Sequence, residues 1–399
     1  MNERESVVIV SAVRTPIGRY GGSLKEISSG YLASLVIGEA VRRAGIESNL
    51  VDEVIVGEVR QTTESSNVAR VAALRAGIPE TTPAFTVNRL CASGMQAIAS
   101  GVQQIQSGQA EVVVAGGVES MSRAPMYLRG SRFGGDNAYL VDSNTEAGQQ
   151  PKELYGENLG MGITAENVAE KYSITREDQD AFALQSQRRA QQAILKGKFR
   201  DEIIPVEIKG KKDVITFEID EHPRPDTTYE KLSSLKPAFK PNGTVTAGNA
   251  CGRNDGAAAL VLMRESKARS LGLRPLAKIM DWASSGVSPD IMGIGPVPAV
   301  KKLLARTRKS LTDIDLFELN EAFAAQALAV IRELGLDEEK VNINGGAIAL
   351  GHPVGATGAR IVTSLLYEMK RQNQRMGIAT LCVGGGQGMA IMIENIEEI

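Results

Sequence analysis

LTDIDLF, residues 311–317, repeats the pattern of SNLVDEV, residues 48–54, and this recurrence decides the fold. A second pair of segments recurs at nearly the same offset, because SGMQA, residues 93–97, falls opposite TGARI, residues 357–361. Chance alternation of similar segments is the competing explanation, but two pairs in the same order make it the weaker one. We therefore predict one α/β unit that occurs twice, with a period too long for a solenoid repeat.

Strand-like and helix-like segments alternate around these pairs. The expected strands are residues 6–13, 51–57, 83–88, 111–120 and 256–263 in the first half and 277–286, 313–320, 377–387 and 388–395 in the second. NINGGAIAL, residues 342–350, is also expected to be extended. Segments of helical spacing separate most of these runs, which favours a layered α/β fold.

A long polar excursion interrupts the first unit. It is rich in Gly, Asp, Asn and Lys and contains at least one strong helix, from ITAENVAEKY into the REDQDAFALQSQRRAQQAILKG that follows. We predict an N-terminal half of residues 1–120 plus 247–268, an inserted loop domain of residues 121–246, and a C-terminal half of residues 269–399. An insertion of this length is expected to serve function.

Composition restricts the class of protein. Of the 399 residues, 43% are hydrophobic and 23% charged, as in ordinary soluble proteins of more than one domain. A net charge of −2 and the lack of a span-length apolar run argue against nucleic-acid and membrane partners. The three cysteines are widely separated, and the start MNERESVVIV has no signal-peptide pattern. We expect free thiols and a cytoplasmic location.

Four turn-like stretches follow expected strands: NRLCASG, LNEAFA, LGHPVGATG and LCVGGGQG. Ligands of layered α/β proteins collect at the carboxyl ends of strands. We therefore expect the polar or reactive residues of these stretches to converge, namely Cys91, Asn320, His352 and Cys382.

Cys91 and His352 are the candidate nucleophile and base. Cys91 stands at the start of an expected helix, where N–H groups and the helix dipole favour a thiolate. Its alternative role is a small buried hydrophobe, although polar neighbours suit a turn better. His352, one of two histidines, can accept a thiol proton near neutral pH, or it caps the following helix. His222 is expected to be exposed or to line a ligand site.

Cys382 and Asn320 complete the candidate set. The glycines after Cys382 let the backbone approach a ligand, and their N–H groups suit a developing oxyanion. A second cysteine beside such a loop indicates a proton donor and acceptor. A disulfide with Cys91 is the competing interpretation, which a cytosolic location disfavours. Asn320 either caps a helix or holds a water or a carbonyl group.

Motifs for other chemistries are incomplete. GATG, residues 355–358, covers only part of a dinucleotide fingerprint. The sequence contains no G-x-x-x-x-G-K-[ST] and no G-x-S-x-G, and its two histidines have no clustered ligand partners. We expect neither a metal nor a cofactor.

With these residues in hand, the chain resembles the thiolases over its whole length. The resemblance rests on NRLCASGMQAI, MGITAENVA, TAGNACGRNDGAAA, NEAFAAQ, NGGAIALGHPVGATGAR and CVGGGQG, in family order. It implies a duplicated five-layered αβαβα fold whose inserted loop domain binds coenzyme A. It also implies acyl-CoA thioesters as substrates and a homo-oligomer with a dimer core. YLRGSRFGGDN, residues 127–137, resembles the loop through which many relatives form tetramers.

The resemblance also implies a role for each residue. Cys91 takes the acyl group as a thioester, His352 activates it, and Cys382 moves the α-proton. His352 and a water on Asn320 form one oxyanion hole, and the N–H groups of Cys91 and Gly384 form the other. The coenzyme A and acyl pocket is expected to contain Arg224, Phe239, Ala247, Cys251, Met161, Met292, Ala322 and Phe323, for which ordinary packing is the alternative role.

Two positions depart from common family patterns. Gly160 stands where many acetoacetyl-forming members carry a histidine, and Cys251 stands where serine is common. Neither belongs to the catalytic set. Both leave the acyl preference open, since a small residue at 160 gives room for a longer or branched chain.

The implied function is that of an acetyl-CoA C-acetyltransferase, which reversibly condenses two acetyl-CoA into acetoacetyl-CoA and coenzyme A. The alternative is a degradative 3-ketoacyl-CoA thiolase of fatty-acid β-oxidation with a preference for longer chains. A decarboxylating ketoacyl synthase would carry a histidine or asparagine where this chain has Cys382. A non-catalytic thiolase-like scaffold is a more distant alternative, and it would be expected to lose Cys91, His352 or Cys382.

Overall fold

The computed structural model describes residues 5–134, 137–146, 148–210 and 213–396. Its strands form a mixed sheet in the order β12-β13-β14-β11-β1-β10-β5-β3-β4. The two ends of this order belong to the two halves of the chain. They join where β1 (Val7–Arg14) pairs with the start of β11 (Ala277–Gly286).

The remaining elements follow in chain order. The N-terminal half contains β2 (Gly18–Arg19), α1 (Ser29–Ala44), β3 (Glu53–Gly57), α2 (Val68–Arg75), β4 (Ala84–Val87), α3 (Ser93–Ser107), β5 (Val112–Ser120), β10 (Asn254–Arg264) and α9 (Glu265–Ser270). The C-terminal half contains α10 (Pro296–Thr307), β12 (Leu316–Leu319), α11 (Ala324–Leu334), α12 (Ala347–Leu350), α13 (Val354–Arg371), β13 (Met376–Val383) and β14 (Gln387–Asn395). Short 3-10 turns lie at Ser48–Leu50, Thr63–Ser65, Met121–Arg123, Pro289–Ile294, Leu311–Asp313 and Glu338–Lys340.

The two halves repeat one strand pattern. β3 is parallel to β5, β5 is antiparallel to β10, and β10 is antiparallel to β1. In the same way, β12 is parallel to β13, β13 is antiparallel to β14, and β14 is antiparallel to β11. The recurring segments behave alike, because the 3-10 turns Ser48–Leu50 and Leu311–Asp313 lead into β3 and β12. The predicted duplication is confirmed.

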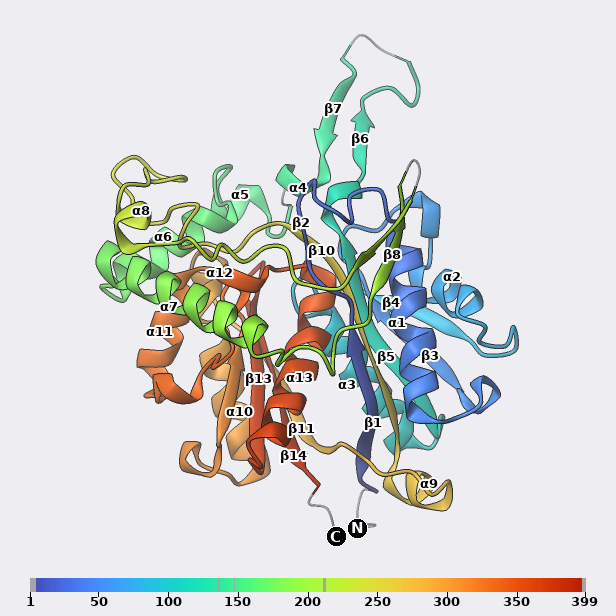
Figure 1. Ribbon diagram of the computed structural model, residues 1–399. Coiled ribbons are helices and arrows are strands. Elements are labelled where there is room, and N and C mark those ends of the chain that lie inside the picture. The colour runs from blue at the N-terminus through green and yellow to red at the C-terminus, as the bar shows by residue number, and fades with distance from the viewer. Residues whose placement is uncertain (1–4, 135–136, 147, 211–212, 397–399) are drawn as a thin grey trace.

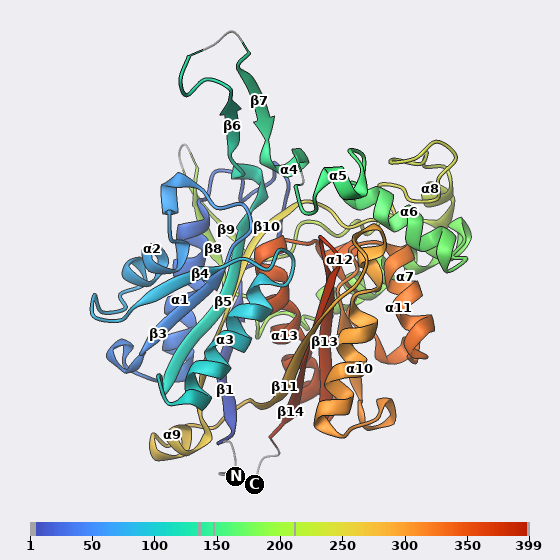
Figure 2. The same cartoon turned by 180° about the vertical axis from the view of Figure 1, so that it is seen from behind.

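Helices divide the molecule into five layers (Figures 1 and 2). α1 and α2 cover the outer face of one half, α10 and α11 cover the outer face of the other, and α3 and α13 pack against each other between the strands. Three large apolar clusters follow these layers, one around α3 and α13, one beneath α1 and α2, and one beneath α10 and α11. The predicted αβαβα arrangement is confirmed.

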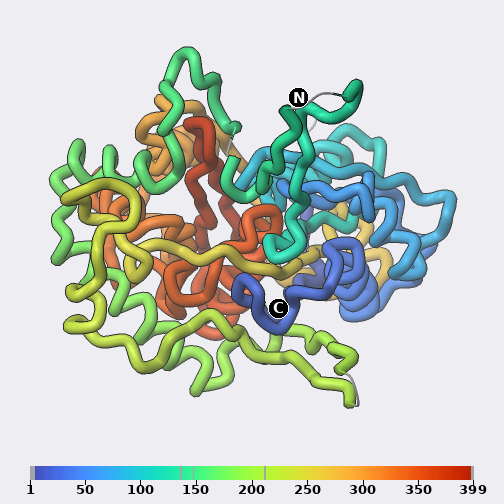
Figure 3. Tube along the Cα trace, turned by 90° about the horizontal axis from the view of Figure 1, so that it is seen from above, coloured from blue at the N-terminus to red at the C-terminus, as the bar shows by residue number. Residues whose placement is uncertain are grey.

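An insertion separates β5 from β10. It contains β6 (Met126–Arg129), β7 (Tyr139–Asp142), α4 (Ser143–Glu146), α5 (Lys152–Tyr155), α6 (Met161–Lys171), α7 (Arg176–Leu195), β8 (Val206–Lys209), β9 (Val214–Phe217) and α8 (Tyr229–Ser233). The β6–β7 hairpin projects from the body in Figure 1. Two residues of the YLRGSRFGGDN segment, Gly135 and Asp136, lie outside the described residues. Seen from above, green and yellow parts of the insertion surround the red β13–β14 turn (Figure 3).

Residues 342–350 are not extended, contrary to expectation. The counterpart of β4 is reduced to a bridge between Phe317 and Val341, after which the chain turns at Asn342 (φ +48°) and enters α12. The side chain of Asn342 accepts the N–H of Leu319 (2.8 Å) and donates to the Leu319 carbonyl (2.7 Å). This amide satisfies the backbone groups that a further strand would have paired, so the strand is dispensable.

The helical stretch in the insertion divides into two helices, α6 and α7. Ser173 has φ +52°, and Thr175 caps α7 in a reciprocal pair with Asp178. Within the described ranges, no helix has both the length and the apolar content needed to cross a membrane.

Candidate active site

Cys91 lies in a tight turn between β4 and α3. Leu90 has φ +48°, a left-handed conformation that costs of the order of 1–3 kcal/mol in a residue with a large side chain. Asn88 Oδ1 accepts the Leu90 N–H (2.8 Å), and the Ser93 hydroxyl donates to the Leu90 carbonyl (2.6 Å). These bonds hold the strained turn and place Cys91 just before the first turn of α3.

The resting thiol of Cys91 is neutral. Burial raises its pKa, while the N–H of Gly384 and the charge of Arg60 act in the opposite direction. The expectation that the helix start favours a thiolate is therefore not met, because the loss of hydration outweighs it. Cys91 needs a base before it can attack an acyl group.

His352 is buried, with 5% of its surface exposed, between α12 and α13. The backbone N–H of His352 donates to Asn254 Oδ1 (2.9 Å). The ring Nδ1 lies 2.7 Å from the hydroxyl oxygen of Thr357. That hydroxyl donates its proton to the Pro353 carbonyl (2.9 Å), so Nδ1 carries the imidazole proton and Nε2 carries the lone pair. Pro353, not His352, is the N-cap of α13, which removes the capping alternative.

The imidazole is neutral as well. Burial, with a smaller contribution from the buried charge of Arg360, lowers the pKa of His352 to about 3. A neutral ring with a free Nε2 can accept a proton, so the site holds a neutral acid and a neutral base.

Cys382 is the penultimate residue of β13 and is 1% exposed. Burial raises the pKa of its thiol well above the ordinary value, and the neighbouring sulfurs of Cys91 and Cys251 add to the rise. All three cysteines are free, which removes the disulfide alternative. After β13 the chain turns through Gly385 (φ +74°), and the N–H of the neighbouring Gly384 opposes the rise in the pKa of the Cys91 thiol.

Asn320 extends β12 beside β13, because its N–H donates to the Thr380 carbonyl (3.0 Å). Its side-chain Oδ1 and Nδ2 are buried and have no hydrogen-bond partner among the described residues. The N-cap of α11 is Phe323, so Asn320 does not cap that helix. A buried amide whose oxygen and nitrogen both lack a partner indicates a place for a bound polar group, such as water or a thioester oxygen.

Cys251, which lies near Cys382, lines a cavity of about 470 Å³. Four predicted binding residues line it: Arg224, Phe239, Ala247 and Cys251. His222 also lines it, and burial lowers the pKa of that imidazole to about 4, so the ring is neutral. The cavity wall therefore combines apolar surface with charged side chains, namely Arg224, Lys231 and Asp226.

The other four predicted pocket residues gather around Cys382 in an apolar cluster that contains Met161, Met292, Ala322 and Phe323. Phe323 meets Phe239 edge to face, with ring centroids 6.2 Å apart, so the two groups of predicted residues are contiguous.

The two positions that depart from family patterns behave differently. A Cβ on Gly160 would meet nothing within 4 Å, so this position has room beside it. Cys251 is held by its N–H, which donates to the Ala322 carbonyl (3.0 Å), and burial raises the pKa of its thiol to about 12. Cys251 is therefore a neutral, weakly polar wall of the cavity.

Sequence reasoning missed four residues around the site. Thr357 orients His352, and Gln187 Oε1 accepts the N–H of Arg224 (2.8 Å). Gln149 packs on the β13–β14 turn, because a Cβ on Gly384 would lie 2.1 Å from its Oε1. Glu119 is fully buried at the end of β5. The sequence could have indicated Glu119, because this carboxylate is the next-to-last residue of an otherwise largely apolar strand.

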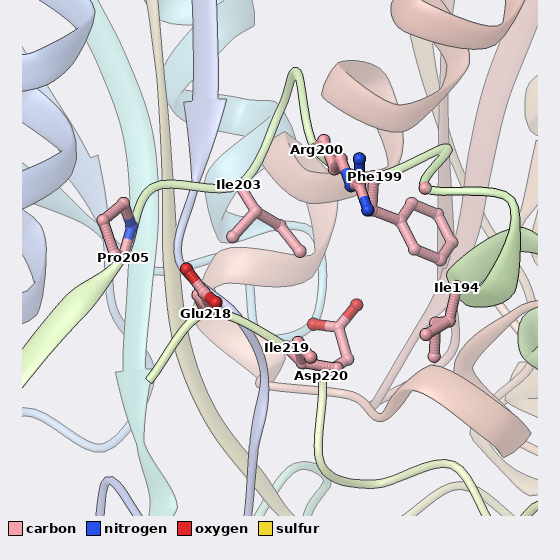
Figure 4. Close-up of a pocket in the computed structure, with 9 residues that line it drawn as sticks. Ile194, Phe199, Arg200, Ile203, Pro205, Glu218, Ile219 and Asp220 are labelled. Carbon is pink, nitrogen blue, oxygen red and sulfur yellow. The ribbon is translucent and has the colours of Figure 1, made fainter. Parts of the chain in front are cut away.

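A separate pocket of about 480 Å³ lies near the end of α7 (Figure 4). It is lined by Ile194, Gly197, Phe199, Arg200, Ile203, Pro205, Glu218, Ile219 and Asp220. None of the predicted site residues belongs to this lining. Asp220 is already engaged by the buried Arg14, whose Nη1 lies 2.7 Å from its Oδ1. Within the described ranges, no group of three or more His, Cys, Asp or Glu side chains is arranged to hold a metal ion.

Known proteins resemble the chain over its whole length. Residues 7–266 match the thiolase N-terminal domain, and residues 273–395 match the thiolase C-terminal domain. The chain is 50% identical over 397 residues to an acetyl-CoA acetyltransferase of Syntrophomonas wolfei, covering 97% of this chain and 98% of that protein. It is 52% identical over 397 residues to an acetyl-CoA acetyltransferase of Escherichia coli, covering 98% and 100%.

Solved structures of other proteins are also similar to the chain over nearly its whole length. The acetyl-CoA acetyltransferase of Bacillus anthracis has a TM-score of 0.96 and 52% identity, covering 99% of this chain and 100% of that one. Human mitochondrial 3-ketoacyl-CoA thiolase in complex with CoA has a TM-score of 0.93 and 44% identity, covering 98% of each chain. The chain belongs to the thiolase family.

Proposed function

We propose that the protein is an acetyl-CoA C-acetyltransferase that reversibly converts two acetyl-CoA into acetoacetyl-CoA and coenzyme A. The observation that carries this proposal is that the Cys91 thiol is close enough to the Gly384 N–H and to the Cys382 thiol for each to influence a thiol pKa, while Cys251, which also acts on Cys382, lines a cavity. Relatives at 50–52% identity bear the acetyltransferase name, whereas the human 3-ketoacyl-CoA thiolase is 44% identical. A long-chain degradative enzyme is therefore not favoured.

In the first step, His352 Nε2 takes the proton of the Cys91 thiol, and the sulfur attacks the acetyl carbonyl carbon. The carbon–sulfur bond to coenzyme A breaks, and the departing thiolate takes the proton from His352. An acetyl-cysteine thioester remains. The neutral resting state of both groups supports this sequence, because charge arises only when the substrate is present.

In the second step, His352 Nε2 takes the proton of the Cys382 thiol, the Cys382 thiolate removes an α-proton from the second acetyl-CoA, and the resulting carbanion attacks the acetyl group on Cys91. The new carbon–carbon bond gives acetoacetyl-CoA, and Cys91 leaves as a thiolate and is reprotonated by His352. In the cleavage direction, the Cys382 thiol returns its proton to the α-carbon. The raised pKa of Cys382 suits this role, since the thiolate of a weak acid is a strong base.

Two oxyanion holes would stabilise the charges that these steps create. The N–H groups of Cys91 and Gly384 suit the oxygen of the acetyl-cysteine intermediate. The protonated Nε2 of His352 and a water on the unpartnered Asn320 amide suit the enolate oxygen of the second thioester. Donors of this kind lower the barrier most when they are fixed before the reaction.

The cavity would hold coenzyme A, with Arg224 near its phosphates and Phe239 against its pantetheine arm. Met161, Met292, Ala322 and Phe323 would surround the acyl group, while Ala247 and Cys251 would border the pantetheine. We infer that the inserted loop domain, residues 121–246, forms most of this binding unit and that residues 1–120 with 247–268 and residues 269–399 form the two thiolase halves.

We further infer a homo-oligomer. β4 ends the strand order and offers an edge for a second copy, which supports a dimer. The β6–β7 hairpin region exposes Met126, Tyr127, Leu128, Phe133, Tyr139 and Leu140, an apolar surface that supports pairing of dimers into a tetramer. Light scattering that gave a monomer mass would contradict both inferences.

The three free cysteines near one another support a reducing compartment, and we propose the cytoplasm. Fatty-acid metabolism is the proposed setting, since acyl-CoA thioesters are the proposed substrates. Metabolite levels decide the direction of flux there.

Cleavage rates on a panel of 3-ketoacyl-CoA thioesters with free coenzyme A test the proposed activity. We expect the highest kcat/KM for acetoacetyl-CoA, with a decline as the chain lengthens. A maximum at longer chains would support the degradative alternative, and the lack of any turnover would support a non-catalytic scaffold.

A further inference from the structure

Glu119 is a buried carboxylate that the proposed reaction does not use. It is the next-to-last residue of β5 and is 0% exposed. Its Oε2 accepts the N–H groups of Val59 (3.1 Å) and Gly355 (2.9 Å), and its Oε1 accepts the N–H of Arg60 (2.9 Å). Hydrogen bonds to a charged acceptor are roughly twice as strong as neutral ones, so this arrangement is a firm clamp.

The three donors come from both halves of the molecule. Val59 and Arg60 follow β3, and the Val59 carbonyl accepts a bond from Asn88 Nδ2 (3.5 Å) in the turn that holds Cys91. Gly355 is the second residue of α13, just after His352, and the N-cap Pro353 offers that helix no side-chain bond. Glu119 supplies the missing acceptor and therefore joins the loop beside Cys91 to the helix beside His352.

Glycines bring these backbones into direct contact. A Cβ on Gly355 would lie 2.4 Å from the Val118 carbonyl oxygen and 2.8 Å from Glu119 Oε2. A Cβ on Gly117 would lie 2.1 Å from the Gly355 carbonyl oxygen. Because no side chain intervenes, movement of β5 or of the clamp is transmitted to the start of α13 and to His352.

Glu58 is a second buried carboxylate beside Glu119. Burial raises the pKa of Glu58 to about 8 and that of Glu119 to about 7, and repulsion between the two contributes to the rise at Glu58. The three N–H donors oppose the rise at Glu119, so Glu58 is the weaker acid and keeps its proton at neutral pH, where Glu119 is partly ionised. The clamp is therefore strongest above pH 7, where Glu119 is charged.

We propose that Glu119 is a positioning residue that sets the separation between His352 and the Cys91 sulfur by fixing the start of α13 against the loop after β3. This inference rests on the proposed function, in which His352 takes the proton of Cys91. A misplacement of about 1 Å between reacting groups costs of the order of a hundredfold in rate, so loss of the clamp has a measurable effect.

The test is Glu119→Gln, which keeps the size of the side chain but replaces one acceptor oxygen with an NH₂ donor. The alkylation rate of Cys91 by iodoacetamide at neutral pH, kcat and the KM for coenzyme A are measured per folded molecule. We expect the alkylation rate and kcat to fall together by roughly tenfold to a hundredfold, with KM unchanged. The control is Asp52→Asn, since Asp52 accepts the N–H groups of Glu111 (2.7 Å) and Val112 (2.9 Å) at the other end of β5.

Unchanged rates per folded molecule, or a loss no larger than that of the Asp52→Asn control, would overturn the proposal. If Glu119→Gln does not fold, amide hydrogen exchange in the wild-type protein decides. The amides of Val59, Arg60 and Gly355 must then be protected and must open together, and independent opening of Gly355 overturns the clamp. Failure of the proposed function would look different from failure of the clamp. In that case acetyl-CoA would not protect Cys91 of the wild-type protein from alkylation.

Discussion

The start of α3 and the start of α13 occupy equivalent places in the duplicated unit, yet they present different groups. α3 follows the full strand β4 through the strained turn at Leu90 and presents the Cys91 thiol. α13 follows α12, because the counterpart of β4 is reduced to one bridge, and presents the His352 imidazole. Apart from this lost strand the two halves share their strand pattern, while the connections before α3 and α13 differ, so one scaffold presents a thiol in one half and an imidazole in the other.

The electrostatics of the two helix starts are opposite. Burial raises the pKa of the Cys91 thiol and lowers the pKa of the His352 imidazole to about 3, because in each case it disfavours the charged form. The pair therefore rests as neutral donor and neutral acceptor. Two variants at these helix starts and one beside His352 test this division of roles.

Cys91→Ser should have the largest effect. A serine hydroxyl is far less acidic than a thiol, so His352 cannot activate it, and formation of the acyl-enzyme should be abolished. The amount of acyl-enzyme is measured by incubating the protein with radiolabelled acetyl-CoA and counting the label in the precipitated protein. Attachment of label to the variant at the wild-type rate would show that the nucleophile is elsewhere.

His352→Asn should lower turnover by roughly two to four orders of magnitude, the usual contribution of a general base. The amide cannot take the Cys91 proton. Circular dichroism and equilibrium binding of coenzyme A should remain as in the wild type. If the variant instead unfolds and its activity falls only in proportion to the amount of folded protein, the role of the histidine is structural.

Thr357→Val should have the smallest effect, a loss of roughly twofold to tenfold in kcat, because one hydrogen bond to Nδ1 is removed. The matched control is Thr363→Val, since the Thr363 hydroxyl bonds to the Ala359 carbonyl (3.0 Å) farther along the same helix. Equal losses in the two variants would show that Thr357 does not orient the imidazole.

Much of the fold was predictable because the pattern of apolar runs records it. The recurrence of residues 48–54 at 311–317 predicted the duplicated layers, and strand ends predicted where polar residues would gather. The loss of the counterpart of β4 was not predictable, since it depends on how the Asn342 side chain pairs with Leu319 in space. Nothing in the identity of Leu90 indicates a left-handed backbone, which tertiary context imposes.

The chemistry of the site was only partly predictable. The residue types at positions 91, 320, 352 and 382 pointed to thiol and imidazole chemistry, but burial reverses the thiolate expected for Cys91. Glu119 escaped notice because its partners are Val59, Arg60 and Gly355, of which the last is far away in the sequence. Such contacts exist only once the two halves have packed together.

The proposed reaction divides its two steps between a thiol of the first half and a thiol of the second. Cys382→Ala tests it most directly, with acetylation of Cys91 followed by peptide mass spectrometry and α-proton exchange of bound acetyl-CoA followed in D₂O. We expect an acetylated Cys91 without exchange, because the base for the second step is gone. Exchange at the wild-type rate with no acetylation would contradict it.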